Sequence, residues 1–526
     1  MLKKHVKGIW LFIISVIGLG IRLLSCLWGF PYLLHPDEGT IVDTTVEMVN
    51  RSSWEADNFA WPAQLLMKLN SIVFNRACFI RYNDIVADTF EDHRIFYYML
   101  ARILTCLFGV LMIILAYFIV EKLRNNMGLL AALVVAIYPV FVKHSAYSTP
   151  DIPLCTLMLF IILMSMQYLE KPSEYVFYGI CVLVGCSFCT KYPGIFFVVF
   201  PAFIAIQKGI SDKKVSFILL KALQAFLTIF LTTFLIMPNF FTNFNGMLNA
   251  VAFEADHDVP GAMDYGFFGN LFYYFRNMFQ YGGVILVILA LFGIIWCIRN
   301  NDLKAKIPLL SFVYVFFICT LKLQWERWGM PFYTVFAIFA VLGIVQILDL
   351  IREKAEDKKS LKFVLYFVVL IFLANIATGA ARSVTSCVVK ENRVRALDYC
   401  QENGITAENT LFDGYTPFLM DHSTKIKVPL DDAGNLAFKK DTKIKYCIVS
   451  SANYERYYIE PVSEQSMKDR VRYDAIFNSL KLVAKWEEYD RNSFLSVVNT
   501  FYSVDETIKM LNGAPSGVTI SIYEVP

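Results

Sequence analysis

The sequence predicts a multi-pass, all-α membrane protein that carries a C-terminal α/β domain on the outer face of the membrane. Of the 526 residues, 57% are hydrophobic and 18% are charged, whereas soluble domains carry about 25% charged residues. Long apolar runs dominate residues 1–382, and charged and polar residues return after Arg382. We therefore divide the chain into a transmembrane module, 1–382, and an extracytoplasmic α/β domain, 383–526.

Composition also excludes several classes of protein. The high apolar content excludes disordered, collagen-like and small disulfide-rich chains. The net charge is +3, and no basic run is interleaved with aromatic residues, so we expect no nucleic-acid partner. The Cys-x-x-Cys pair at Cys186 and Cys189 lies inside an apolar run. We interpret it as core packing rather than as a metal or redox motif.

About eleven apolar runs are candidates for membrane-spanning helices. The first follows Lys3, Lys4 and Lys7 and is longer than the apolar core of a signal peptide, so we expect an uncleaved helix. The runs cover residues 9–30, 95–120, 127–143, 152–169, 175–189, 194–207, 217–237, 281–298, 307–321, 330–349 and 362–381.

The basic residues of the short loops predict a cytoplasmic N-terminus. An odd number of spans then places the C-terminal domain outside the cell, as in a multi-pass protein of the plasma membrane. The predicted outer short loops contain only Lys143, Lys191, Lys322 and Arg327. The predicted inner loops contain Lys122, Arg124, Lys171, Lys208, Lys213, Lys214, Arg299, Lys304, Lys306, Arg352, Lys354, Lys358, Lys359 and Lys362.

Two large outer loops are expected, at 31–94 and 238–280. The first begins His35-Pro36-Asp37-Glu38, which places two adjacent carboxylates at the membrane face. These residues could be solvated or part of a turn, or they could form a site. The stretches 40–50 and 61–74, with Trp54 and Trp61 nearby, are amphipathic. We expect them to form helices that lie on the bilayer and shape an opening for a lipid.

A second candidate carboxylate is Asp151, which lies between Pro150 and Pro153 at the start of a predicted span. Asp is favoured as a helix cap. The carboxylate could equally face the same site as Asp37, and both roles can hold together.

The cations of the outer loops are candidates for binding a phosphate. Lys191, followed by Tyr192, and Arg327 each lie in a tight turn among aromatic residues. Snorkelling of a cation toward the membrane interface is the alternative explanation, but such cations can also bind phosphate oxygens. Arg22 lies inside the first span, where a charge is costly and suggests a function.

A divalent metal is a further candidate ligand. The 238–280 loop contains Glu254, Asp256 and His257, whose side chains are of the types that bind such ions. Their spacing is typical of no particular metal site, and we expect no other cofactor.

The C-terminal segment has the pattern of a small α/β domain. Helices are predicted near 391–403 and 467–482, and strands at 410–412, 446–450, 482–486 and 518–523. The domain could bind an acceptor or act as a lid. Three of its acidic residues are expected to be solvated: Asp413, Asp431 and Asp432.

Taken in order along the chain, these motifs resemble the GT-C glycosyltransferases, over about residues 1–380. The most similar branch contains the protein O-mannosyltransferases and the lipid A aminoarabinose transferase, and the C-terminal segment resembles the tail domain of bacterial members. The matching pieces are Arg22-Leu23, His35-Pro36-Asp37-Glu38, the stretch from Arg102 through Pro139 to Asp151, Lys191-Tyr192, and Arg327 before Pro331.

The resemblance implies a polyprenyl-phosphate-linked sugar donor and an acceptor hydroxyl on a lipid, a glycan or a protein. Asp37, Glu38 and Asp151 would be the catalytic residues, with Asp37 as the base of an inverting displacement. The donor phosphate would be bound by Lys191, Arg327, Arg22 and Tyr192. The Trp328-Gly329 pair departs from the family, in which a Tyr and an aliphatic residue often follow the arginine.

A lipid or sugar transporter, or a flippase, is the alternative function. A transporter is expected to have ionisable residues near the midplane of several spans. In this sequence the ionisable residues gather at one face of the predicted membrane module. That distribution favours an enzyme that works at the outer surface.

Overall fold

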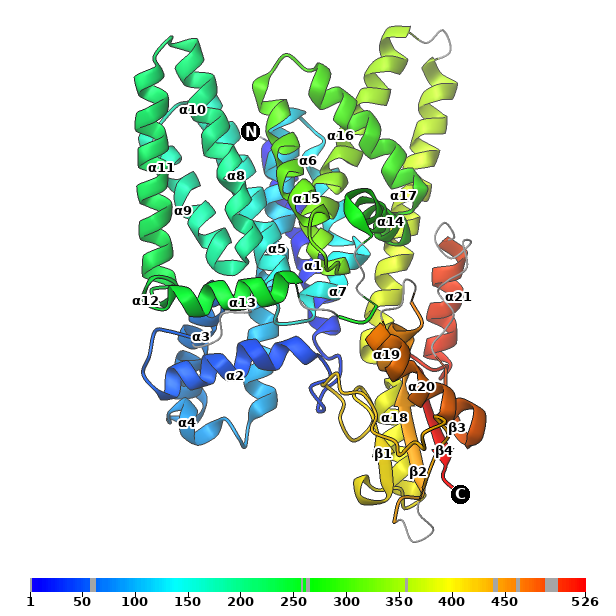
Figure 1. Cartoon of the computed structure of the whole chain (residues 1–526). Coiled ribbons are helices and arrows are strands. Elements are labelled where there is room, and N and C mark those ends of the chain that lie inside the picture. The colour runs from blue at the N-terminus through cyan, green and yellow to red at the C-terminus, as the bar shows by residue number, and fades with distance from the viewer. Residues whose placement is uncertain are drawn as a thin grey trace.

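The protein is described by a computed structural model of residues 2–56, 63–256, 259–261, 265–354, 358–438, 443–459, 464–487 and 500–526. A bundle of long helices forms the body of the molecule (Figure 1). The helices of the first outer loop and the C-terminal domain lie at one end of this bundle, and the N-terminus lies toward the other. All twelve cysteines are free thiols.

Within the described residues, eight helical runs are long and apolar enough to cross a membrane, or nine if a bent pair counts as one span. The bent pair is α6 (Gly128–Ala136) and α7 (Pro139–Ser145), which meet at 56°. The eight runs are α1 (Leu2–Ser25), α5 (Arg94–Leu123), α8 (Asp151–Glu170), η1 (Tyr192–Val198) with α10 (Val199–Ser211), α11 (Val215–Ile236), α14 (Gly266–Arg299), η3 (Glu326–Gly329) with α16 (Met330–Lys354), and α17 (Lys358–Val388).

By this measure the described residues contain eight or nine candidate spans, where the sequence predicts about eleven, to within one or two. The run 175–189 forms α9 (Glu174–Thr190), which has 17 residues. The run 307–321 forms η2 (Leu303–Ser311) and α15 (Phe312–Cys319), of which only the second is α-helical. Helices α9 and α15 lie among longer helices of the bundle (Figure 1).

The segment expected as the second outer loop, 238–280, overlaps the first part of a long helix. It contains α12 (Asn239–Thr242) and α13 (Phe244–Asp256), after which α14 begins at Gly266. Gly283 has φ 71° and ψ 174° and breaks the helical path within α14. The apolar pattern began only at 281 because polar residues such as Asn270 and Asn277 interrupt the first half of the helix, where both are buried.

The first outer loop folds into three helices: α2 (Pro36–Asn50), α3 (Gln64–Tyr82) and α4 (Val86–Thr89). The two expected amphipathic helices are confirmed. Their apolar faces pack together and against the start of α5, where the buried side chains include Val42, Val46, Phe74 and Tyr97. Trp54 is half exposed, whereas Trp61 lies outside the described residues.

The C-terminal domain contains a four-stranded sheet in the order β1-β2-β4-β3. Strands β1 and β2 are parallel, and β4 runs antiparallel to β2 and β3. All four predicted strands and both predicted helices are present. The elements are α18 (Asn392–Glu402), η4 (Ala407–Asn409), β1 (Thr410–Phe412), β2 (Tyr446–Ser450), α19 (Ser451–Tyr454), η5 (Glu455–Tyr457), α20 (Glu464–Ser479), β3 (Lys481–Trp486), α21 (Thr500–Leu511) and β4 (Ile520–Glu524).

Asp413 corrects one expectation for this domain. Asp431 and Asp432 are exposed as expected, but Asp413 is fully buried at the end of β1. Its carboxylate accepts hydrogen bonds from the Ser450 amide at 3.1 Å and from the Tyr473 hydroxyl at 3.2 Å. Burial raises the pKa of Asp413 well above its usual value. The sequence did not indicate that Asp413 is buried, because an Asp-Gly pair is also typical of exposed turns.

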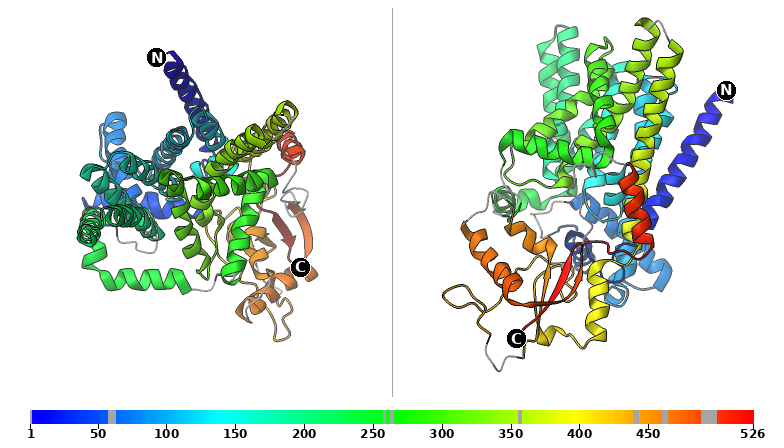
Figure 2. Two further views of the ribbon diagram at one scale, coloured as in Figure 1. Left: turned by 90° about the horizontal axis from the view of Figure 1, so that it is seen from above. Right: turned by 90° about the vertical axis from the view of Figure 1, so that its right-hand side faces the viewer.

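The domain continues directly from the last long helix. α17 extends to Val388, beyond the boundary expected at 382. α21 returns to lie beside α17 (Figure 2), where Arg382 Nη1 and Glu506 Oε2 are 3.2 Å apart. The domain is thus attached to the bundle at two places in the sequence.

Candidate active site

The first turn of α2 presents Asp37. Pro36 begins the helix, where its fixed φ and missing amide hydrogen are tolerated. His35 caps the helix, because its Nδ1 accepts a hydrogen bond from the Asp37 amide at 3.2 Å. The Asp37 carboxylate forms an ion pair with Arg327 of η3, and the two side chains keep 16% and 17% of their surface exposed. Asp37 is therefore held in place and still reachable.

Glu38 lies in a different environment from its neighbour. Its carboxylate is fully buried and pairs in bidentate fashion with Arg102 of α5, at 2.8 Å and 2.5 Å. The Ser148 amide donates to the same carboxylate at 2.8 Å. Arg102 also donates to the carbonyls of Cys26 and Trp28. Although we expected Glu38 among the catalytic residues, the structure places it as an anchor that fixes α2 to three other segments.

Asp151 forms the second carboxylate–cation pair of the site. Pro150 occupies the N-cap position of α8, and Asp151 is the first residue of the helix. Its buried carboxylate accepts a hydrogen bond from Lys191 Nζ at 2.6 Å. The Lys191 ammonium lies 5.8 Å from the ring centroid of Trp328, the residue next to Arg327. Trp328 thus brings the Lys191 pair near the segment that carries Arg327.

A further acidic group, Glu326, was not predicted from the sequence. Glu326, directly before Arg327, lies 3.3 Å from Lys143 Nζ and 3.1 Å from His144 Nε2. Two signals could have indicated it: its place beside Arg327, and the scarcity of cations such as Lys143 in the short outer loops. This cluster ties η3 to the end of α7.

The structure does not bring Arg22 to this site. Its guanidinium is fully buried and donates to the carbonyls of Val135 and Ala136 at the end of α6, at 3.1 Å and 2.9 Å. It also contacts Ser145 Oγ at 3.2 Å. The charge therefore satisfies carbonyls that the break between α6 and α7 leaves without helical partners, and no exposed surface remains to meet a phosphate.

Tyr192 lies next to Lys191 at the start of η1 and is half-buried. Its ring packs near Phe188, with ring centroids 5.6 Å apart. The predicted metal ligands Glu254, Asp256 and His257 lie outside the side chains that the structure describes. Among the side chains it does describe, no group of three or more His, Cys, Asp or Glu could hold a metal ion.

Aromatic rings and cations surround His35. Its ring centroid is 4.4 Å from that of Tyr147 and 6.3 Å from that of Trp28. Burial, and after it the nearby charges of Arg327 and Arg102, lower the pKa of His35 well below its usual value. A neutral imidazole suits the observed cap, since Nδ1 must be unprotonated to accept a hydrogen bond.

These residues give the site a defined chemical capacity. A reachable carboxylate, Asp37, can accept a proton from a hydroxyl group. Two cations, Arg327 and Lys191, lie in adjoining ion pairs and can stabilise negative charge on an oxyanion. Helix α2, which presents Asp37, lies at the end of the bundle where the C-terminal domain sits (Figure 1).

One family model matches part of the chain. Residues 98–238 match the family model described as dolichyl-phosphate-mannose-protein mannosyltransferase. That segment includes Arg102, Asp151 and Lys191 of the site. Among curated proteins, none matches the chain.

Solved structures match over nearly the whole chain. The apo oligosaccharyltransferase of Archaeoglobus fulgidus is similar with a TM-score of 0.52 and 11% identity, over 100% of this chain and 89% of that chain. The same enzyme tethered to an acceptor peptide containing the NVT sequon gives 0.51 and 11%, over 99% and 89%.

A third solved structure is more distant. ArnT from Cupriavidus metallidurans bound to undecaprenyl phosphate gives a TM-score of 0.46 and 12% identity, over 90% of this chain and 96% of that chain. This likeness is too weak to support a conclusion. The chain thus shares its overall fold with the oligosaccharyltransferase, and residues 98–238 are similar to the mannosyltransferase family.

Proposed function

We propose that the protein transfers a sugar from a polyprenyl-phosphate donor to an acceptor hydroxyl. The observation that carries the proposal is the reachable Asp37–Arg327 ion pair beside the Asp151–Lys191 pair. The first pair supplies a base next to a cation, and the second adds another cation nearby. A base and positive charge are both needed when a hydroxyl group displaces a phosphate.

The reaction is a single displacement at the anomeric carbon. The acceptor oxygen forms a bond to that carbon while the bond to the phosphate oxygen breaks. The hydroxyl proton passes to the Asp37 carboxylate, and the electron pair of the broken bond leaves with the polyprenyl phosphate. Attack opposite to the leaving group inverts the anomeric configuration.

Arg327 and Lys191 stabilise the departing phosphate, on which negative charge grows in the transition state. Arg327 is well suited to this role, because a guanidinium can bond the phosphate and Asp37 through different nitrogens. Asp151 holds the Lys191 ammonium in position. Tyr192 stands beside Lys191 and completes the predicted phosphate site.

An apolar groove near these cations suits the lipid tail of the donor. The cavity has a volume of about 670 Å³ and is lined from α9, η1, α10, α11 and α12. Phe188 at its wall packs near Tyr192, the neighbour of Lys191. A chain lying in the groove would leave its phosphate near the predicted cation site, while the hydrocarbon stays among apolar side chains.

The donor class is further supported by the matched family, whose description includes dolichyl-phosphate-mannose. The acceptor is a lipid, a glycan or a protein. We place the reaction on the extracytoplasmic face of a plasma membrane, in a bacterium by the resemblance of the C-terminal segment. The basic residues of the opposite end favour this orientation. The transporter alternative has no support from the matched proteins.

The proposal is tested with purified protein in lipid nanodiscs and a panel of radiolabelled polyprenyl-phosphate sugars. We expect one donor to release polyprenyl phosphate as its label moves to an acceptor, and the product to have the inverted configuration by NMR. Retention of configuration would exclude the single displacement. If no donor of the panel were turned over with any of the three acceptor classes, the proposed activity would be wrong.

A further inference from the structure

We propose that Arg393, from the C-terminal domain, is a positioning residue for Asp37, so that the domain is a working part of the active site. The inference rests on the proposed function. Arg393 touches neither of the ion pairs described above, and it lies in the part of the chain beyond the matched family segment.

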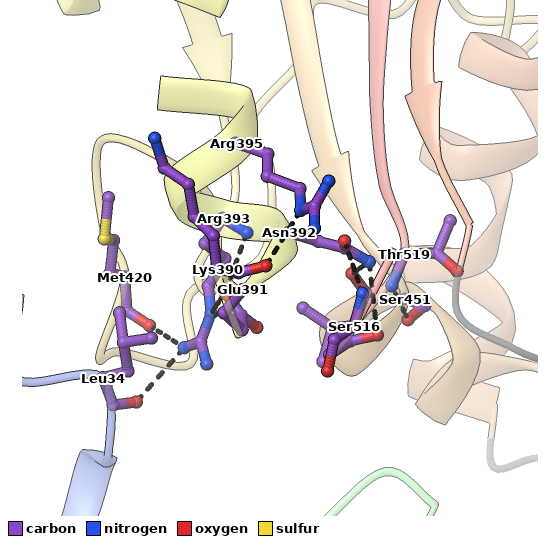
Figure 3. A network of polar contacts seen from close by, with 12 residues as sticks. Leu34, Lys390, Glu391, Asn392, Arg393, Arg395, Met420, Ser451, Ser516 and Thr519 are labelled. Atoms are coloured by element: carbon purple, nitrogen blue, oxygen red, sulfur yellow. Dashed lines mark hydrogen bonds and ion pairs between the residues drawn. The ribbon is translucent and has the colours of Figure 1, made fainter. Parts of the chain in front are cut away.

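The Arg393 side chain extends from the C-terminal domain to Leu34, in the segment directly before α2 (Figure 3). Its Nη1 donates to the Leu34 carbonyl at 3.1 Å and to the Met420 carbonyl at 2.5 Å. Its Nε lies 3.0 Å from both carboxylate oxygens of Glu391. The Arg393 side chain is 5% exposed. A guanidinium buried to this degree is held by several charge-assisted hydrogen bonds at once.

The position of Leu34 affects the residues that orient Asp37. Leu34 is fully buried and precedes His35, the residue that caps α2 through the Asp37 amide. The Trp28 ring lies 5.8 Å from the Arg393 guanidinium and 6.3 Å from the His35 ring. A shift of Leu34 would therefore move His35 and the first turn of α2, on which Asp37 stands.

Hydrogen bonds within the C-terminal domain also fix the position of Arg393. The Arg393 amide donates to Glu391 at 2.8 Å, which fixes the start of α18. Asn392 bonds the Ser516 amide at 3.0 Å and the Val518 carbonyl at 3.0 Å, just before β4 (Figure 3). The guanidinium is thus preorganised by the sheet before it meets Leu34.

The domain also reaches the other partner of the catalytic pair. Tyr415 lies close enough to Arg327 for the two to interact electrostatically, and its hydroxyl is 3.4 Å from Arg456 Nη2. Tyr415 has φ 56°, which is rare for a bulky residue. Its amide donates to the His422 carbonyl at 3.0 Å, which holds this conformation. The C-terminal domain therefore contacts the segment that carries Asp37 and has Tyr415 near Arg327.

Arg395 provides a matched control. It lies two residues further along α18, and its guanidinium donates to the carbonyl of Lys390 at 2.8 Å (Figure 3). It also donates to the carbonyls of Gly513 at 3.0 Å and Ala514 at 3.3 Å, which are likewise within the domain. Replacing it by Met removes the same charge from the same helix without touching Leu34.

The experiment compares wild type, Arg393→Met, Arg393→Lys and Arg395→Met as full-length protein in nanodiscs. Sugar transfer gives kcat and the donor KM, and hydrogen exchange reports the amides of residues 34–38 and of β2 and β4. We expect Arg393→Met to lower kcat about 10- to 100-fold, the range for a small misplacement of a catalytic group. The donor KM should stay within about twofold, and faster exchange should be confined to residues 34–38.

The kcat of Arg393→Lys should lie between those of wild type and Arg393→Met. A lysine keeps the charge but cannot bond two carbonyls and a carboxylate in the planar arrangement of Arg393. Arg395→Met should keep both kcat and the exchange at residues 34–38 within about twofold of wild type. A residue that served only the stability of the domain would not produce this order.

Three results would overturn the proposal. One is a kcat of Arg393→Met within twofold of wild type. Another is faster exchange in β2 and β4 equal to that at residues 34–38, which would mean that Arg393 stabilises the domain and does not position Asp37. The third is an equal loss of kcat in Arg395→Met. If wild type itself transferred no sugar, the proposed function would fail, and the exchange pattern alone would decide whether Arg393 orders the Asp37 turn.

Discussion

Asp37 and Glu38 are adjacent in sequence, but their carboxylates lie in different environments and have different partners. Successive residues of a helix point about 100° apart, so one faces the exposed edge of α2 and the other faces the bundle. Glu38 is fully paired with Arg102, whereas Asp37 keeps part of its surface. The Asp-Glu motif could be located from the sequence. The division of roles could not, because it depends on Arg102, which lies in another helix.

Lys191 should be needed to keep the Asp151 carboxylate stable in its buried place. Lys191→Met leaves this buried carboxylate without its cation, which costs about 3–5 kcal/mol. The double variant Lys191→Met/Asp151→Asn removes the orphaned charge and should recover most of that loss. Thermal unfolding in detergent, run as a double-mutant cycle, measures both. Equal destabilisation by the single and double variants would show that the loss does not come from the orphaned Asp151 carboxylate.

His35 should make the fold sensitive to acid. Because the pKa of His35 is lowered in the folded protein, its contribution to stability is complete above the unfolded value of about 6.5. It is lost as the pH falls toward the folded value, at up to about 1.4 kcal/mol per pH unit. His35→Asn keeps a capping oxygen but cannot titrate. The melting temperature of wild type should therefore fall more than that of His35→Asn between pH 7.5 and 5.5, and parallel curves would contradict this.

At the scale of elements, the helix pair α14 and α16 shows how small residues build the bundle. A Cβ added to Gly293 would lie 1.8 Å from the Phe339 carbonyl oxygen, and one added to Gly343 would lie 1.8 Å from the Leu289 carbonyl oxygen. The backbones therefore approach each other closely at both glycines, as small residues permit between helices in membranes. This contact sets the position of α16, which follows directly after Arg327.

Gly343→Ala should therefore destabilise the protein and lower transfer activity, since the two backbones must separate. Gly20→Ala is the control, because a Cβ at Gly20 of α1 has no atom within 4 Å. Alanine in that helix should be neutral or stabilising, by up to about 1 kcal/mol. Melting temperatures of the two variants test the difference. A Gly343→Ala protein as stable as Gly20→Ala would refute the close contact.

Element boundaries were predicted unevenly, for physical reasons. The strands of the C-terminal domain follow local patterns of β-branched and aromatic residues, and their positions agree with the structure. The first half of α14 did not follow its local pattern, because buried polar residues such as Asn270 find partners on other segments. The same applies to Asp413, which is buried by contacts from Ser450 and Tyr473.

At the scale of the whole molecule, the site is assembled from segments far apart in sequence. Asp37, Asp151, Lys191 and Arg327 come from four separate places and are joined in two ion pairs. The sequence could place all four on one face through the distribution of basic residues. It could not pair them, and it indicated neither the role of Glu326 nor the contact of Arg393 with Leu34. Those depend on how the helices pack and how the C-terminal domain docks.

The two ends of the bundle should lie on opposite sides of the membrane. Asp432→Cys marks the C-terminal domain and Ser211→Cys marks the far end of α10, and both positions are exposed. An impermeant maleimide should label the first variant in intact cells and the second only after lysis, because the basic end faces the cytoplasm. Wild type is the control for the native thiols. Labelling in the reverse order would overturn the orientation.

The most direct measurement compares the release of polyprenyl phosphate by wild type, Asp37→Asn and Asp43→Asn with the donor that wild type uses. Asp43 is the matched control, because it is an aspartate of the same helix that pairs with Arg94 and Tyr98 outside the site. The release rate should fall at least about 100-fold in Asp37→Asn, as expected for loss of a general base. Asp43→Asn should stay within about twofold of wild type. An Asp37→Asn protein as active as Asp43→Asn would contradict the assignment of Asp37 as the base.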